Sequence, residues 1–188
     1  MTLFYMTVKR LIVIISMVVL TSAGTLVFTH SKGASANKSA EAVLKGASGL
    51  PLPRFVSLKF DKVNVRKGPS VKHQVAWIFA RKGLPVEIIA EFEHWRRVRD
   101  SEGEEGWVYF SLLTGKRTVL VTPWRKKQRI ELYGQADGTG TPIAVVEAGA
   151  LGAVKNCTGK WCHFAAAGIE GWISQELLWG VYPDEHLN

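Results

Sequence analysis

The sequence has few of the residues and motifs from which enzyme active sites are built. Its 188 residues include two cysteines and five histidines. The histidines form no close motif, and no G-x-S-x-G, H-E-x-x-H or phosphate-binding glycine loop occurs. A cysteine nucleophile needs a nearby histidine base, whereas the two cysteines of this chain are expected to cross-link each other. We therefore expect a protein without catalytic residues, cofactor or metal.

Cys157 and Cys162 lie in the stretch NCTGKWCH, with Thr158 and Gly159 between them. This spacing suits a hairpin whose two strands are bridged just outside the turn, so a disulfide is predicted. A metal site would need both cysteines, His163 and a fourth ligand, and the spacing matches no standard zinc motif. A redox-active pair would favour C-x-x-C. The structural disulfide is the preferred interpretation.

Acidic residues are outnumbered by basic ones, 16 to 24, which gives a formal net charge of +8. Such a surplus favours anionic partners or surfaces. The basic residues include Lys9 and Arg10, which precede the apolar run LIVIISMVVL, and an A-x-A site follows at residues 34–36. This order is typical of a secretory signal, here residues 1–36, with a second candidate cleavage site at residues 21–23.

The alternative interpretation of the N-terminus is an uncleaved membrane anchor, because residues 11–28 are just long enough to span a bilayer. In either case the rest of the chain leaves the cytoplasm. We expect a periplasmic or exported protein, anchored in the inner membrane if the signal stays uncleaved. Export removes the chain from nucleic acid, which is therefore not an expected partner. Residues 37–53, NKSAEAVLKGASGLPLP, have little apolar content and are predicted to form a flexible tether.

A repeat organises the remaining chain. The stretch EGEEGWVYFSLL, residues 102–113, returns in similar form as GIEGWISQELL, residues 168–178. Upstream of these copies, residues 83–95 align with residues 149–161 without a gap, glycine on glycine and tryptophan on tryptophan. Matching residues at matched spacing are hard to obtain by chance. The chain therefore contains two copies of one small unit.

Each copy consists of short β-branched and aromatic runs separated by glycine-containing turns, which predicts a small all-β barrel or sandwich. Only the SLL and QELL segments suggest a single helical turn. The predicted organisation is a first domain at residues 54–121, a basic connector at 122–129 and a second domain at 130–185. Each domain has about 60 residues, near the lower limit for independent folding.

At these motifs the chain resembles the bacterial SH3-like (SH3b) domains of exported proteins, in the tandem form found in proteobacteria. The resemblance rests on VNVRKGPS (63–70), GLPVEI (83–88), WRRV (95–98), GWV (106–108), and on KWCHF, GWI and LWGVYP (178–183) in the second copy. It implies two tandem, five-stranded, partly open barrels that adhere to cell wall or to other proteins. The second copy departs from the pattern, because ELYGQADGTGTP replaces the VNVRKGPS stretch.

Two sets of residues are candidates for ligand binding. The resemblance places a groove beside the loop after Asn64 and near four residues of the first domain: Asn64, Arg66, Trp95 and Tyr109. The connector supplies the second set: Trp124, Arg125, Lys126, Lys127 and Arg129. A charge run of this kind forms either a solvated face or a site for an anionic glycan or lipid headgroup.

The tryptophans divide into two groups. Four occur at matched positions of the two copies and are expected to pack in or over the cores: Trp95, Trp107, Trp161 and Trp172. Trp77, Trp124 and Trp179 have no partner in the other copy. These three are candidates for a contact between the domains, and Trp124 in the connector is the best candidate.

Two functions follow from these observations. The first is a non-catalytic module that attaches to peptidoglycan or another envelope glycan through basic and aromatic residues. The second is an adaptor that binds an envelope protein through an exposed strand edge or loop. The two differ in their response to salt, because a polyanion site weakens as salt screens it, whereas an apolar contact does not.

Overall fold

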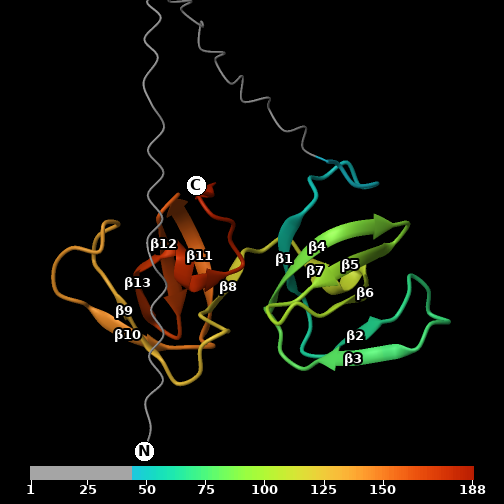
Figure 1. Ribbon diagram of the computed structural model, residues 1–188, viewed down its shortest axis with the longest axis horizontal. Coiled ribbons are helices and arrows are strands. Elements are labelled where there is room, and N and C mark those ends of the chain that lie inside the picture. The colour runs from blue at the N-terminus through green and yellow to red at the C-terminus, as the bar shows by residue number, and fades with distance from the viewer. Residues whose placement is uncertain (1–43) are drawn as a thin grey trace, which may run out of the picture. The chain divides into compact units, whose positions relative to one another are not determined.

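The computed structural model describes residues 44–188, which fold into β-strands and two single-turn 3-10 helices (Figure 1). The all-β fold with two tandem barrels predicted from the sequence is confirmed. The predicted signal or anchor, residues 1–36, and the first residues of the tether lie outside the described residues. Within residues 44–188, no helix has the length and hydrophobicity needed to cross a membrane.

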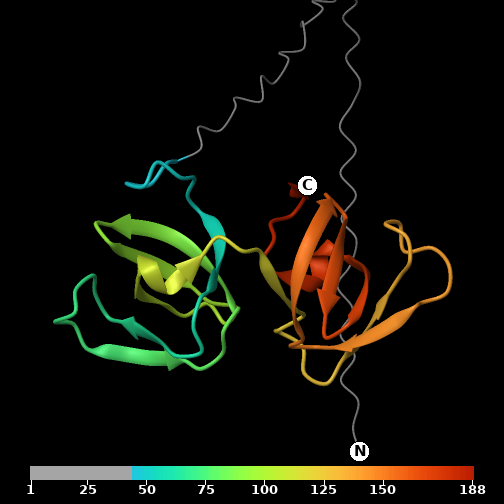
Figure 2. The same cartoon turned by 180° about the vertical axis from the view of Figure 1, so that it is seen from behind.

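The first domain contains one seven-stranded antiparallel sheet with the order β3-β2-β6-β5-β4-β1-β7. The β2–β3 hairpin lies at one end of this order, as Figures 1 and 2 show from opposite sides. The elements are β1 (Arg54–Leu58), β2 (Val63–Arg66), β3 (Val75–Phe79), β4 (Pro85–Phe92), β5 (Trp95–Arg99), β6 (Glu105–Tyr109), η1 (Phe110–Leu112) and β7 (Leu113–Thr114).

Alternation along the strands builds the core of the first domain. In β2, Val63 and Val65 are fully buried, while Asn64 between them is exposed. Successive side chains of a strand point to opposite faces, so this segment presents one apolar and one polar face. The other strands add their own inward residues, and the core consists of Val56, Leu58, Val63, Val65, Val86, Ile88, Val98 and Val108.

The second domain repeats this design around a larger core that contains Phe164 and both cysteines. Its main sheet has the order β13-β12-β11-β8-β14, with β15 also paired to β11, and β9 and β10 form a separate pair. The elements are β8 (Thr118–Val121), β9 (Arg129–Leu132), β10 (Ala144–Glu147), β11 (Leu151–Thr158), β12 (Trp161–Ala166), β13 (Ile169–Ser174), η2 (Gln175–Leu177), β14 (Leu178–Trp179) and β15 (His186–Leu187).

The boundary between the domains differs from the predicted one. Strand β8 was expected to close the first domain, but it pairs with β11 and β14 of the second. It plays the part there that β1 plays in the first domain, where β1 pairs with β4. The run TVLV stands between the two copies, and its own residues do not tell which sheet it joins. The link between the domains is therefore residues 115–117, and residues 122–128 form a loop inside the second domain that ends where β9 begins.

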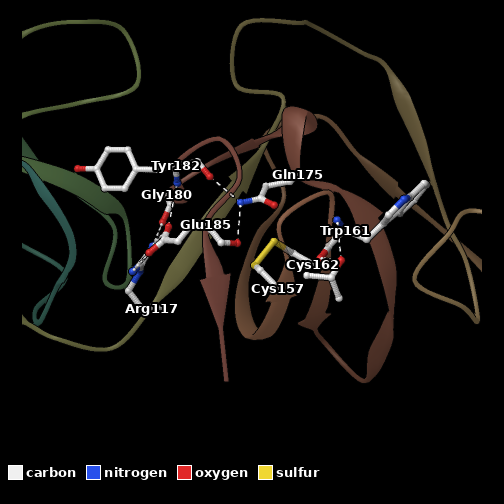
Figure 3. Close-up of a disulfide and its surroundings, with 9 residues drawn as sticks. Arg117, Cys157, Trp161, Cys162, Gln175, Gly180, Tyr182 and Glu185 are labelled. Atoms are coloured by element: carbon white, nitrogen blue, oxygen red, sulfur yellow. Dashed lines mark hydrogen bonds and ion pairs between the residues drawn. A yellow bond between two sulfur atoms is a disulfide. The ribbon is translucent and has the colours of Figure 1, made fainter. Parts of the chain in front are cut away.

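The predicted disulfide is confirmed. Cys157 and Cys162 are direct partners on β11 and β12, and their sulfur atoms are bonded (Figure 3). The turn between the strands is residues 159–160, so the bridge lies just outside it, as expected. Both cysteines are buried in the second core. The bridge therefore cross-links the hairpin and also fills part of the apolar interior.

Residues 44–53 depart from the prediction of a flexible tether. They form a tight turn closed by the bridge between Lys45 and Pro51. The carboxylate of Glu91 in β4 holds this turn, because it accepts hydrogen bonds from the Ser48 backbone N–H (2.7 Å) and hydroxyl (2.8 Å). The same carboxylate pairs with Arg54 at 2.6 Å and Arg96 at 3.1 Å. Polar contacts, not the burial of apolar side chains, hold these residues in place. The composition of the segment does not show such contacts.

Replacing both Cys157 and Cys162 with alanine is expected to lower the free energy of unfolding by about 2 kcal/mol, the value for closing so short a loop. Urea unfolding of the oxidised wild type and the double variant measures this difference. The wild type in reductant is the control and should resemble the variant. Equal unfolding midpoints for the oxidised wild type and the variant would contradict the prediction.

Acid is expected to release the N-terminal turn. Burial raises the pKa of Glu91, but hydrogen bonds from Ser48 and Arg54 and the charge of Arg96 outweigh it, so the pKa lies below its usual 4.5. A lowered carboxyl pKa stabilises the folded state above the usual value, and this contribution is lost as pH falls below it.

The NMR signal of the Ser48 amide, followed from about pH 7 to about pH 3, measures this release. Glu91→Gln should abolish the transition at the Ser48 amide, and Glu170→Gln, a control at another carboxyl with a lowered pKa, should leave it in place. An identical titration of Ser48 in wild type and Glu91→Gln would refute the assignment.

Candidate functional site

The outer face of β5 and β6 carries the aromatic and basic residues of the first domain. Trp95 lies opposite Tyr109, and Arg97 lies opposite Trp107. Arg66 of β2 lies opposite Trp107 on its other side. Residues directly opposite in a ladder share one face of the sheet. Trp107 is therefore flanked by two arginines on the face that points away from the core.

An aromatic cluster continues from this face. We define it as His94, Trp95, Tyr109 and Phe110. The Trp95 and Tyr109 rings meet edge to face with centroids 5.4 Å apart, and the Tyr109 and Phe110 centroids are 5.2 Å apart. Trp95 is only 8% exposed, whereas Phe110 is 45% exposed. Trp95 therefore forms the buried part of the cluster, and the Phe110 ring is exposed to solvent.

The four residues predicted for the first domain come together on neighbouring strands. Asn64 and Arg66 share the outer face of β2, while Tyr109 and Trp95 share that of β6 and β5. Their role in binding stays a prediction. Sequence reasoning missed Arg97 and Phe110 as members of this surface. The register could have placed Arg97 there, since it stands two residues from Trp95 and so faces the same side.

A groove opens beside the aromatic cluster, although not at the loop after Asn64 where the resemblance placed it. Its volume is about 830 Å³. Phe110 and Arg96 form one side of it, and the turn at residues 48–54 forms another. Phe55 and Ile88 add apolar lining, and Tyr182 of the second domain lines the groove as well. Phe110 and Arg96 also contact each other, with the guanidinium 5.9 Å from the ring centroid.

The second domain lacks the counterparts of Tyr109 and Phe110. When Gly106 and Trp107 are aligned with Gly171 and Trp172, residues 174 and 175 occupy the positions of Tyr109 and Phe110. These residues are serine and glutamine. Trp161, the counterpart of Trp95, instead packs on Tyr133 of another strand pair, with ring centroids 5.8 Å apart. The second domain therefore has an aromatic face of different composition, in which the His163 and Trp172 ring centroids lie 5.3 Å apart and Tyr133 pairs with Trp172.

The predicted basic connector is a separate surface on the second domain. Arg125 closes its first turn, donating a backbone hydrogen bond to the Thr122 carbonyl, and its guanidinium donates to Gln128. Lys126 and Lys127 are exposed, and Arg129 begins β9 opposite Glu147. The loop does not lie between the domains, so the structure does not join it to the aromatic cluster.

The prediction that Trp124 mediates the contact between the domains is wrong. Trp124 is 53% exposed, because the loop that carries it connects two strands of the second domain. Trp77 also stays within one domain, where its ring packs on Phe79. Trp179 makes the contact: its ring lies edge to face against Phe55 of β1, with centroids 5.1 Å apart, and its indole N–H donates to the Pro85 carbonyl.

A buried polar network completes the junction between the domains. Glu87 of β4 accepts a hydrogen bond from the Tyr182 hydroxyl at 2.9 Å and two from Arg99 at 3.0 Å and 2.5 Å. Burial, together with the bond to the Glu87 carboxylate, raises the pKa of Tyr182. The bond to Glu87 likewise raises the pKa of Arg99. Tyr182 therefore stays a neutral donor to the Glu87 carboxylate across the junction.

Arg117 in the link fixes the C-terminal segment (Figure 3). Its guanidinium donates two hydrogen bonds of 2.8 Å to the Glu185 carboxylate and one to the Gly180 carbonyl. It also lies over the Phe55 ring, 6.0 Å from the centroid. Burial raises the pKa of Glu185, but the hydrogen bonds from Arg117 and from the Tyr182 backbone N–H lower it by more. The pKa of Glu185 therefore lies below its usual value.

The family model of the bacterial SH3 domain matches residues 59–115 and 126–180, which together exceed half of the chain. The chain belongs to the bacterial SH3 domain family. Each match lies within one barrel and begins after its first strand, β1 or β8. Both copies are therefore SH3 domains, including the second, whose first loop departs from the pattern. The aromatic cluster and one side of the groove therefore lie on the first of two tandem SH3 domains.

Two solved structures resemble the SH3 pair weakly. NlpC2 from Trichomonas vaginalis has 15% sequence identity and a TM-score of 0.31, and the match covers 68% of this chain and 48% of that chain. NlpC1 from the same organism has 16% identity and a TM-score of 0.31, with 72% and 48% covered. The chain thus spans about half the length of these proteins, and a likeness at this level carries no conclusion. No curated protein matches the sequence.

Tyr182→Phe is expected to lower the free energy of unfolding by about 2 kcal/mol, because it removes a buried hydrogen bond to a charged acceptor while keeping the ring on Phe55. Urea unfolding measures the loss. Tyr133→Phe is the matched control, since its hydroxyl donates to Glu131 at an exposed site, and its loss should be much smaller. Equal effects of the two substitutions would show that the Glu87 contact contributes nothing particular.

Proposed function

We propose that this pair of SH3 domains is a non-catalytic, exported binding module that attaches to peptidoglycan or another glycan of the cell envelope. The binding site is the groove of the first SH3 domain together with its aromatic cluster. The proposal is carried by one observation, which is that the exposed Phe110 ring belongs both to the cluster and to the wall of the groove.

The lining of the groove suits a ligand with apolar faces and polar edges. Binding sites of this kind combine an apolar and aromatic lining with a few fixed polar groups. Phe55, Phe110 and Ile88 supply the apolar surface, and Arg54 and Arg96 supply donors held in place by Glu91. A sugar ring can stack its C–H face on Phe110 while its hydroxyl and acetamido groups meet the arginines.

Charge and covalent chemistry support the same proposal. The surplus of basic residues attracts the carboxylates that wall peptides carry. A disulfide is typical of proteins that function in an oxidising compartment outside the cytoplasm, which agrees with export through the N-terminal segment. The same bond removes both thiols of the chain from nucleophilic chemistry.

A second candidate function is an adaptor for an envelope protein, and one observation favours it. Strand β3 ends the first sheet, so one of its edges faces solvent. Val75 and Ile78 on this strand are exposed, Ile78 by 55%. An open apolar edge can accept an extended segment of a partner as an additional strand.

Sedimentation with insoluble peptidoglycan tests the glycan proposal. The purified protein, starting at residue 37, is incubated with the polymer at low and moderate salt, and the bound fraction is measured. Phe110→Ala should weaken binding about fivefold or more, as expected for an aromatic residue at the centre of a site. Trp124→Ala removes another exposed aromatic side chain outside the groove and should change binding less than about twofold.

A further variant with alanine at Arg125, Lys126, Lys127 and Arg129 tests the basic loop. Loss of binding only in this variant would move the site to the second SH3 domain. Absence of sedimentation at every salt concentration would refute the glycan proposal and favour the adaptor.

A further inference from the structure

Three lysines gather at the junction of the SH3 domains, in a pocket that shares Thr114 with the neighbouring groove and is apart from the basic loop. Lys59 follows β1, Lys82 precedes β4, and Lys116 lies in the link between the domains. All three line one pocket with a volume of about 350 Å³. They come from segments far apart in the sequence, so the fold and not a run of basic residues brings them together.

Two hydroxyl groups hold the lysine-bearing segments in place. Ser57 is buried, and its hydroxyl lies 2.6 Å from both the Lys116 carbonyl and the Thr118 hydroxyl. The Thr118 hydroxyl also lies 2.6 Å from the Gly83 carbonyl, so the two hydroxyl protons serve two of these three contacts at a time. The contacts connect Lys116 with Ser57, two residues before Lys59, and with Gly83, which follows Lys82. The backbone from which the three ammonium groups extend is therefore fixed before any ligand arrives.

The lysine side chains of this pocket have no ion-pair partner within residues 44–188. The lining contains no carboxylate. Asp61 is the acidic residue of the same loop, and it accepts the backbone N–H of Lys82 at 3.3 Å. Three like charges around one small pocket repel each other unless an anion lies between them.

Phe60 adds an apolar rim to the pocket. Its ring is 47% exposed, and the Lys59 ammonium lies 5.6 Å from the ring centroid. The site therefore combines clustered ammonium groups with one aromatic face. Ammonium groups bind phosphate as point charges, whatever the direction from which the oxygens approach.

We propose that Lys59, Lys82 and Lys116 form a binding site for a compact, multiply charged oxyanion such as a phosphate group. The site is distinct from the groove and does not depend on the proposed glycan function. Such a group occurs free in solution, on a polymer or on a membrane lipid, and the three ammonium groups recognise the same chemistry in each case.

Titration with inorganic phosphate at constant ionic strength, followed by NMR of the backbone amides, tests the site. Saturable shifts centred on residues 59, 82 and 116 are expected. Lys59→Gln with Lys82→Gln should weaken binding about fivefold or more. The matched control, Lys126→Gln with Lys127→Gln in the basic loop, removes the same charge and should change binding less than about twofold.

Asp61→Asn keeps an acceptor for the Lys82 N–H but removes the negative charge, so it should strengthen phosphate binding. Co-sedimentation with vesicles, with and without phosphatidic acid, then distinguishes the sources. Vesicle binding that the Lys59/Lys82 variant loses would assign the site to a lipid headgroup, and phosphate binding without vesicle binding would assign it to a soluble or polymer-borne group. Shifts that do not saturate, or equal weakening in both lysine variants, would overturn the proposal.

Discussion

The other features depend on one interaction between the domains. Trp179 and Tyr182 pack against the Phe55 ring, and the buried Glu87 carboxylate accepts a hydrogen bond from the Tyr182 hydroxyl. Each SH3 domain has a small core, and single cores of this size supply little stability. The junction adds three aromatic rings and a charged hydrogen-bond network to both. Because Glu87 is bonded by Tyr182 from one domain and Arg99 from the other, the two barrels share one buried charge, and separating them would leave it with an incomplete set of partners.

Both candidate sites use this junction. Tyr182 and Glu185 of the second domain help to line the groove whose other walls belong to the first. The lysine pocket crosses the same boundary, since Ser57 and Thr118 join β1 to β8 beneath it. The second SH3 domain therefore completes surfaces of its neighbour.

Much of the fold could be predicted from the sequence, because it depends on local patterns. The alternation of valine and polar residues in VNVR predicts which face of β2 is buried, the repeated Gly-Trp motif predicts the duplication, and the spacing of Cys157 and Cys162 predicts a bridged hairpin. The features that were missed depend on pairing between distant segments. The residues of TVLV do not determine which sheet the strand joins, and the sequence around Glu91 does not identify Ser48 as its hydrogen-bond partner. Trp124 and Trp179 cannot be distinguished by residue type, because only the folded structure shows which of them contacts the other domain. The same limit explains why the lysine pocket was not predicted, as its members stand more than 20 residues apart in sequence.

The two SH3 domains must move as one body, because the groove and the lysine pocket both take lining residues from each of them. Residual dipolar couplings of backbone amides in both domains, measured in one weakly aligned sample, test this claim most directly. The account predicts that a single alignment tensor fits the couplings of residues 54–114 and 118–187 together. Two different tensors, one for each domain, would show that the domains reorient independently, and both the groove and the lysine pocket would then lack one of their walls for much of the time.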